Sequence, residues 1–168
     1  GNRKIGYDAQ VQPTYFISNA FSVYTGLYFE NTPDWLVWQH DNLIGSFHER
    51  AVQLNLGFDW SIDNRQELRM KVQALGLNAG LRQGYLVDGN GRAIVSDEPI
   101  DDISVRNMGL QIRYRYELAP LSYLYVVYGR GGYAQDAADR DTTQLLRNSF
   151  ALRDDEQFLV KVSYRFDM

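Results

Sequence analysis

The chain has 168 residues, with 17 Lys and Arg against 21 Asp and Glu, a net charge of -4 and no cysteine. The lack of cysteine excludes disulfides and thiolate metal sites within this chain, and the scattered basic residues exclude the clustered phosphate contacts of a nucleic-acid-binding protein. The longest apolar runs, such as residues 124–128, are far shorter than the roughly 18 residues that a membrane-spanning helix needs. A helical membrane protein is therefore excluded.

The first third of the chain has the alternating pattern of long β-strands. Apolar residues occupy every second position from Ile5 to Tyr15 and again from Val52 to Trp60, which predicts two strands with one face toward an apolar medium. Residues 21–30 predict another strand, whose Gly and aromatic content leaves open which face points outward. Residues 31–47 predict a long polar loop, with an eighth strand within Trp35 to Ile44 as the alternative.

The alternation continues toward the C-terminal end. Residues 68–77 predict a strand in which Leu75 and Leu77 fall out of phase, as a β-bulge would produce. Residues 108–118, 123–130 and 158–166 predict three more strands, and the pattern leaves the outward face open in the second of them. Most of these strands have about ten residues, whereas strands in soluble proteins have about five or six and a transmembrane β-strand needs roughly 9 to 11.

Short and long connections alternate along the chain. Turn residues at 18–19, 63–65 and 119–120 predict tight hairpins, and polar stretches at about 31–47, 80–106 and 131–156 predict long loops. Outer-membrane barrels have short periplasmic turns and long extracellular loops. If the last strand ends at the periplasm, the first one begins outside, so an even strand count needs at least one further strand upstream.

These observations predict the fold class. It is all-β, an antiparallel up-and-down meander that forms a transmembrane β-barrel or the C-terminal part of a larger one. Residues 1–168 are interpreted as a single outer-membrane barrel segment that lacks upstream strands and an N-terminal domain.

The two faces of the predicted strands have different chemistry. One face carries charges of both signs, which predicts a polar lumen, with a salt-bridged plug or a solvated sheet face as the alternatives. The predicted lumen-lining residues are Glu67, Arg69, Lys71, Arg113, Arg115, Glu117, Lys161 and Arg165. The predicted lipid-facing residues are Val52, Leu54, Leu56, Phe58, Met108, Leu110, Ile112, Val160 and Val162.

The end of the chain resembles the C-terminal signal that the outer-membrane barrel assembly machinery reads, in which alternating apolar residues finish in an aromatic one. The matching residues are Phe158, Val160, Val162, Tyr164 and Phe166. In that signal the aromatic residue is normally the last one, whereas Asp167 and Met168 follow Phe166 here. The resemblance implies the assembly machinery as a partner during biogenesis.

A larger part of the chain, from about Gly6 to Phe166, resembles the C-terminal barrel of a family of bacterial envelope proteins. These proteins carry an N-terminal module similar to family-9 carbohydrate-binding modules. The resemblance is carried by residues 111–122, by residues 124–128 and by the closing strand. It implies a larger barrel and a further N-terminal domain, and the biochemical activity of the family is not established.

Few residues in the sequence indicate a binding, metal or catalytic site. Trp35 and Trp38 lie near acidic residues in the first predicted loop, where aromatic platforms could contact a sugar, although a loop that packs on itself is the favoured interpretation. Acidic stretches in the later loops could hold Ca²⁺, but their spacing matches no EF-hand and solvated loops are favoured. The sequence contains no recognisable catalytic or zinc motif around His40 and His48, so we expect no enzyme site, metal or cofactor.

The sequence therefore predicts an outer-membrane barrel that serves as a solute conduit or as the membrane anchor of a larger envelope protein. The expected partners are outer-membrane lipid and lipopolysaccharide, with carbohydrate as a further candidate and no nucleic acid. The first alternative is a carbohydrate-binding or carbohydrate-processing envelope protein whose active domain lies upstream. The second alternative is a soluble, lipocalin-like barrel that encloses a ligand.

Overall fold

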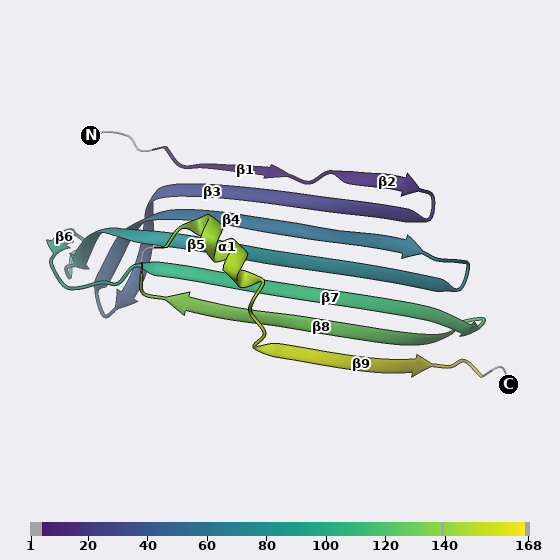
Figure 1. Cartoon of the computed structure of the whole chain (residues 1–168). Helices are drawn as coiled ribbons and strands as arrows, with labels where there is room; N and C mark the ends of the chain where they lie inside the picture. The colour runs from purple at the N-terminus through teal and green to yellow at the C-terminus, as the bar shows by residue number, and fades with distance from the viewer. Residues whose placement is uncertain (1–4, 139, 167–168) are drawn as a thin grey trace.

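The computed structural model describes residues 5–138 and 140–166, and Asp167 and Met168 lie outside that part of the chain. The described residues form one antiparallel sheet (Figure 1). The strands of this sheet are β1 (Tyr7–Val11), β2 (Thr14–Ser18), β3 (Phe21–His40), β4 (Leu43–Ser61), β5 (Gln66–Val87), β6 (Ala93–Ser96), β7 (Ile103–Ala119), β8 (Ser122–Asp136) and β9 (Asp155–Ser163). The described part of the chain also contains one helix, α1 (Thr142–Ser149).

Neighbouring strands in the sheet are also neighbours along the chain. The order is β1-β3-β4-β5-β7-β8-β9, with β2 beside β3 and β6 beside β5, and every pairing is antiparallel. The prediction of an all-β antiparallel meander of long strands is therefore confirmed. The sheet is open in Figure 1, with β1 and β2 along one edge and β9 along the other.

The three short turns lie where the sequence predicts them, but the three long loops contain more structure than expected. Residues 31–47 are not a loop, because β3 and β4 continue through them to a turn at Asp41 and Asn42. They are not a separate eighth strand either. In the second loop β5 extends to Val87 and β6 pairs with it, and in the third loop β8 extends to Asp136 before α1 begins.

Two local predictions within the strands are also corrected. The first predicted strand is divided at Gln12 and Pro13 into β1 and β2, because proline has no N–H to donate to the ladder. The predicted bulge around Leu75 is wrong, since β5 keeps one register with both neighbours through residues 74–77. The apparent change of phase arises because Gly76 and Asn78 replace apolar residues on one face and Leu75 and Leu77 lie on the other.

The continuous registers gather most of the apolar residues of the long strands on a single face. Leu27 of β3 lies opposite Leu54 of β4, and Leu54 lies opposite Ala74 of β5. We call this surface the apolar belt. Its residues are Val23, Leu27, Phe29, Val52, Leu54, Leu56, Phe58, Leu68, Met70, Val72, Met108, Leu110, Ile112, Leu124, Val126, Val160 and Val162.

Helix α1 lies against this same face, at one end of the belt. Asp141 caps the helix by accepting a hydrogen bond from the backbone N–H of Gln144 at 2.9 Å, and Leu145 is buried against the sheet. Gly76 allows this approach, because a Cβ there would lie 2.5 Å from the carbonyl oxygen of Thr142 and 2.6 Å from the backbone nitrogen of Leu146. Helix α1 has eight residues. In the described chain no helix is long and apolar enough to cross a membrane.

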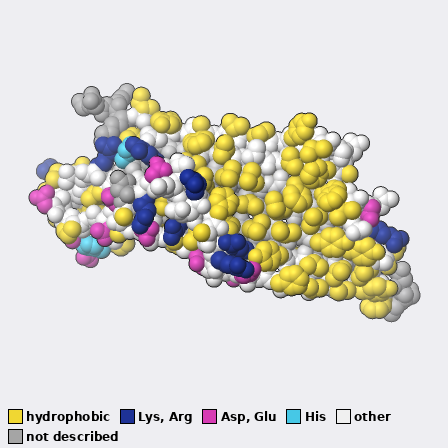
Figure 2. Space-filling model, viewed as in Figure 1, with side chains coloured by type: hydrophobic (Ala, Val, Ile, Leu, Met, Phe, Trp, Pro, Cys, Tyr) yellow, Lys and Arg dark blue, Asp and Glu magenta, His cyan; other side chains and the backbone are white. Residues whose placement is uncertain are grey.

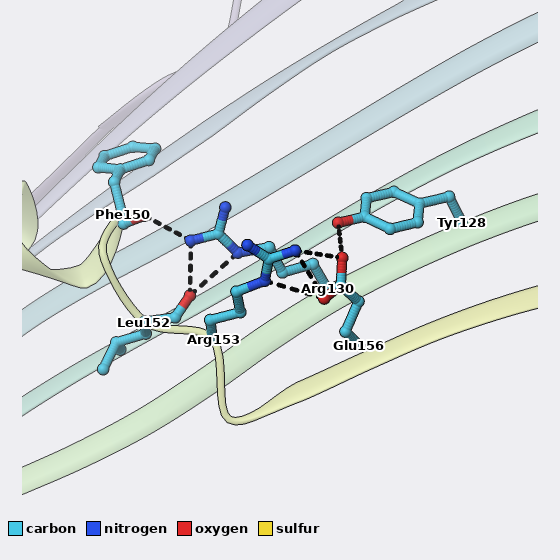
Figure 3. Close-up of polar contacts among 6 residues, drawn as sticks. All are labelled: Tyr128, Arg130, Phe150, Leu152, Arg153 and Glu156. Carbon is cyan, nitrogen blue, oxygen red and sulfur yellow. Dashed lines mark hydrogen bonds and ion pairs between the residues drawn. The ribbon is translucent and has the colours of Figure 1, made fainter.

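Side chains of β8 and β9 hold the segment that follows α1 (Figure 3). The Arg130 guanidinium donates hydrogen bonds to the carbonyl oxygens of Phe150 and Leu152. Arg153 donates two hydrogen bonds of 2.8 Å to Glu156, and the Tyr128 hydroxyl donates one of 2.6 Å to the same carboxylate. These contacts attach the segment that follows α1 to the end of β9.

The sheet has little buried interior. In the described part of the chain the buried hydrophobic side chains are Leu43, Phe47, Ala51, Ala74, Ala79, Met108, Leu145 and Leu152. No second sheet covers the belt among the described residues, and Figure 2 shows hydrophobic side chains spread over this face, with charged side chains gathered mainly toward its ends. The belt is therefore an exposed apolar surface, covered only at one end by α1.

Candidate functional site

The face opposite the belt, which we call the polar face, carries the predicted lumen-lining residues. Alternation places Glu67, Arg69 and Lys71 of β5 on it, and the register brings them beside the charged residues of β7. Arg113, Arg115 and Glu117 of β7 and Lys161 of β9 share this face. Arg165 follows the end of β9, where its backbone N–H donates a 3.0 Å hydrogen bond to the Ser122 hydroxyl.

A ladder of ion pairs crosses three strands of the polar face near their turns. Arg69 Nε lies 3.0 Å from Asp59 of β4 and also contacts Glu67, and Arg115 lies 3.1 Å from Glu67. The Glu67 side chain is only 12% exposed, so the two guanidinium groups compensate the charge of a carboxylate that is largely removed from water. Arg115 also lies over the Tyr123 ring of β8, 5.4 Å from its centroid.

The polar face is hollowed beside this ladder. A cavity of about 670 Å³ is open to solvent, and amide and hydroxyl groups lie along it together with Asp59, Arg69 and Lys71. Its other lining residues are Gln12, Thr14, Tyr24, Asn55, Val72, Gln73, Gly109, Leu110 and Gln111. These residues come from both sides of β3, so the hollow spans several strands of the sheet.

Glycine residues keep this part of the polar face free of large side chains. Two adjacent rows of residues cross β3, β4, β5, β7 and β8 at the level of the hollow. They are Gly26, Asn55, Gln73, Gly109 and Gly131, and Tyr24, Gly57, Lys71, Gln111 and Gly129. The Tyr24 ring lies over Gly57, where any Cβ would collide with it, whereas a Cβ at Gly109 would meet nothing within 4 Å.

Farther along the polar face, beyond the level of the belt, the charge is acidic. Glu49 of β4 is 4% exposed, and its Oε2 atom has no hydrogen-bond partner among the described residues. Burial and then the neighbouring charge of Glu30 raise the pKa of Glu49 to about 6. Glu30 accepts hydrogen bonds from the hydroxyl groups of Tyr28 and Thr32. The ladder of ion pairs and this acidic pair therefore lie at opposite ends of the polar face.

The predicted sugar-contact residues do not form one platform. Trp35 and Trp38 are three positions apart in β3, so strand alternation directs their side chains to opposite faces. The Trp35 ring packs near Phe47, with their centroids 6.4 Å apart. Trp38 is 66% exposed and donates a hydrogen bond to the carbonyl oxygen of Asp41. Close to the same hairpin, His40 lies 3.2 Å from Glu98.

The predicted lipid-facing and assembly-signal residues lie as follows. Val52, Leu54, Leu56, Phe58, Met108, Leu110, Ile112, Val160 and Val162 all belong to the belt face, and in the described chain only Met108 of them is buried. Phe158, Val160 and Val162 lie in the edge strand β9, on the belt face. Tyr164 and Phe166 follow the end of β9, with their ring centroids 5.0 Å apart.

Sequence reasoning did not identify the neutral residues of the hollow. Asn55, Gln73 and Gln111 are uncharged, and only the register shows that they lie beside Lys71. Their alternation with Leu54, Val72 and Leu110 was the available signal, but it specifies a face and not a position along that face. Among the described residues no group of three His, Cys, Asp or Glu is arranged to hold a metal ion.

Comparison with known proteins gives a family and no function. A family model described as "Domain of unknown function (DUF5916)" matches residues 1–168. The searches of curated proteins and of solved structures gave no match. The chemistry of the two sheet faces is thus the basis for assigning a role.

Proposed function

Because this chain belongs to the DUF5916 family, whose description names no activity, we propose a function from its geometry. In this proposal the chain forms part of a β-barrel in the bacterial outer membrane, with the belt against lipid and the polar face toward water. The barrel serves as a conduit for small solutes or as the membrane anchor of a larger envelope protein. Outer-membrane lipid, including lipopolysaccharide, is then the partner of the belt.

The uncovered belt is the observation that carries this proposal. Val160 and Val162 are 54% and 61% exposed, and Leu27 and Phe29 are 40% and 45% exposed. Removing apolar surface from water stabilises a protein by about 25 cal/mol per Å², and an exposed apolar patch of this extent indicates a membrane or protein partner. Lipid tails would cover every strand of the belt at once.

The length of the belt agrees with a bilayer. Its apolar face covers nine residues in each of β3, β4 and β7, at positions 21–29, 52–60 and 108–116, and a transmembrane β-strand needs roughly 9 to 11 residues. Beyond position 52, the same face of β4 continues with Arg50 and His48. The change from apolar to polar residues therefore fits the boundary between hydrocarbon and headgroups.

Closure of the barrel sets a further requirement. The outer edges of β1, β2 and β9 have no strand partner in the described chain, and an unsatisfied backbone group in lipid costs several kcal/mol. With β1 and β2 counted as one strand, the path has seven strands, so its two edge strands run in the same direction. An antiparallel closure therefore needs an odd number of added strands, which we place in another part of the full-length protein.

The polar hollow distinguishes this proposal from a lipocalin-like barrel. A lipocalin-like barrel would enclose a largely apolar ligand site. Here amides, hydroxyls and three charged side chains line the hollow together with Gly109, Val72 and Leu110, and most of the apolar side chains lie on the opposite face.

The carbohydrate alternative has one supporting observation. The resemblance to envelope proteins with an N-terminal sugar-binding module implies a carbohydrate-binding domain upstream, and Trp38 is 66% exposed near the β3–β4 turn. In that case the barrel is an anchor, and the sugar chemistry belongs to the upstream domain. Replacement of Trp38 by Ala would then change carbohydrate binding only if the hairpin itself contacts the sugar.

The test uses the absence of cysteine from this chain. Leu54→Cys and Asn55→Cys in the full-length protein place a probe on neighbouring positions of opposite faces. After reconstitution into vesicles with brominated lipids, we expect a fluorophore at position 54 to be strongly quenched and one at position 55 to remain accessible to a water-soluble quencher. Val160→Cys and Lys161→Cys form a second matched pair in β9.

Equal quenching by lipid at positions 54 and 55 would overturn the membrane assignment. If the assignment holds, conductance across planar bilayers separates a conduit from an anchor. A conduit gives a steady conductance that Gly109→Leu lowers, because that side chain would enter the hollow.

A further inference from the structure

We infer that the hollow of the polar face is a binding site for small anionic, hydroxyl-rich solutes such as sugar acids, with Lys71 as the residue that binds the anionic group. This inference rests on the proposed function in one respect, because it takes the polar face to be in contact with water. It adds a ligand class and a particular site to a surface so far described only as a lumen lining.

Of the two cations that line the hollow, Arg69 and Lys71, only Lys71 has no counterion among the described residues. Arg69 is compensated by Asp59 and Glu67. Lys71, one step farther along the same face of β5, is exposed and forms no ion pair with any residue that the structure describes. A lysine ammonium is a compact charge with three donors, which suits a carboxylate or a phosphate group.

Neutral hydrogen-bonding groups surround this cation. Asn55, Gln73 and Gln111 each offer an amide with both donors and acceptors, and Thr14 and Tyr24 add hydroxyl groups to the same cavity. A solute with several hydroxyl groups can exchange hydrogen bonds with all of these residues, whereas chloride or acetate can use only a few. The lining therefore favours an anion that also carries hydroxyl groups.

The glycines of the two rows leave space for such a ligand. Gly26, Gly109 and Gly131 occupy the row of Asn55 and Gln73, and Gly109 lines the cavity, which measures about 670 Å³. Ligand sites for small molecules commonly measure about 300 to 1,000 Å³. A monosaccharide acid fits this size and also the charge of Lys71.

The experiment measures binding by the detergent-solubilised full-length protein with isothermal titration calorimetry. Galacturonate is the probe, galactose is the neutral comparison and acetate is the comparison without hydroxyl groups. We expect saturable binding of galacturonate, with weaker binding of the other two. Lys71→Gln should raise the Kd for galacturonate at least about tenfold, because it removes a charge-assisted hydrogen bond.

Two variants serve as controls for the position of the site. Lys161→Gln removes a cation from the same face but outside the hollow, and it should leave the Kd unchanged. Gly109→Val should abolish binding while the protein remains folded, because its side chain would enter the hollow without a collision. An unchanged circular dichroism spectrum and an unchanged thermal unfolding midpoint would show that this variant is folded.

Three results would overturn the inference: no saturable heat with galacturonate, the same Kd in Lys71→Gln as in the unmodified protein, or equal losses in Lys71→Gln and Lys161→Gln. The lipid-quenching experiment at positions 54 and 55 is independent of this outcome. A quenched probe at position 54 without saturable binding rejects the solute site and retains the membrane assignment. Binding that depends on Lys71, without lipid quenching at position 54, retains the solute site and rejects the membrane assignment.

Discussion

The belt and the polar face are built from alternate residues of the same strands, yet their side chains are arranged by different rules. On the belt, Leu54 and its neighbours need only to be apolar and to keep the register. On the polar face, Glu67 needs Arg69 and Arg115 at particular distances. The comparison teaches that one face is filled by apolar side chains of many shapes and carries charge at the level of the belt only near α1, where Arg130 and Glu156 are hydrogen-bonded, whereas the other face carries charged residues of both signs on several strands.

The largest effect is expected from a charge placed on the belt. If the belt faces lipid as proposed, Leu54→Arg should lower the free energy of unfolding from lipid vesicles by about 2 to 4 kcal/mol, because a cation near the middle of a lipid-facing strand is poorly solvated. Asn55→Arg, on the opposite face of the same strand, should change it much less. Urea-induced unfolding in vesicles, followed by tryptophan fluorescence, measures both variants. Equal losses would show that the two faces meet the same environment.

A smaller loss is expected where α1 covers the end of the belt. Gly76→Val should destabilise the protein by about 1 to 3 kcal/mol, because the new side chain would collide with the backbone of α1. Hydrogen exchange of residues 142–149 should become faster as the helix leaves the sheet. Gly80→Val is the matched control in β5, since a Cβ there meets nothing within 4 Å. Unchanged exchange in Gly76→Val would contradict the packing of α1.

On the polar face, the buried Glu49 should make stability depend on pH. Its pKa of about 6 lies above the ordinary value of 4.5, so the folded state favours the protonated carboxyl. Stability is then greatest below about pH 4.5 and falls as the pH rises through 6. Glu49→Gln should therefore raise the free energy of unfolding at pH 8 by up to about 2 kcal/mol and change little at pH 4. Urea unfolding at the two pH values tests this, and a variant that is less stable at pH 8 would refute it.

The smallest effect is expected beside α1. The Glu156 carboxylate accepts hydrogen bonds from Arg153 and Tyr128, so Glu156→Gln should weaken the attachment of the segment that follows α1. Because this carboxylate is exposed, the change should be local. Hydrogen exchange of residues 150–156 should become faster in Glu156→Gln, and unchanged exchange would contradict the role of these contacts.

The sequence was sufficient to predict the regular part of the molecule. Strict alternation in residues 52–60 and 108–118 identified two of the long strands, and the turn residues at 63–65 and 119–120 identified two hairpins. These features are local, because side chains alternate with a period of two and turns select Asp, Asn and Pro. The same logic failed at residues 31–47, where a β-hairpin continues through residues of mixed polarity.

Contacts between residues that are distant in the sequence could not be predicted. The phase of Leu75 was misread because Gly76 leaves room for α1, a helix about 70 residues further along the chain. The hollow was missed because Asn55, Gln73 and Gln111 are ordinary polar residues until the register brings them beside Lys71. Closure of the barrel and the outer-membrane location remain predictions.

The sequence by itself determined that the strands are long, antiparallel and two-faced, because the period of side-chain direction is set within each strand. Only the tertiary structure decided which residues of different strands meet. The registers of β3 to β8 align the glycines over the hollow, bring Glu67 between two arginines and bring α1 onto Gly76. The physical reason is that contacts between strands depend on how the strands slide against one another, and that position is determined by the packing of the whole sheet.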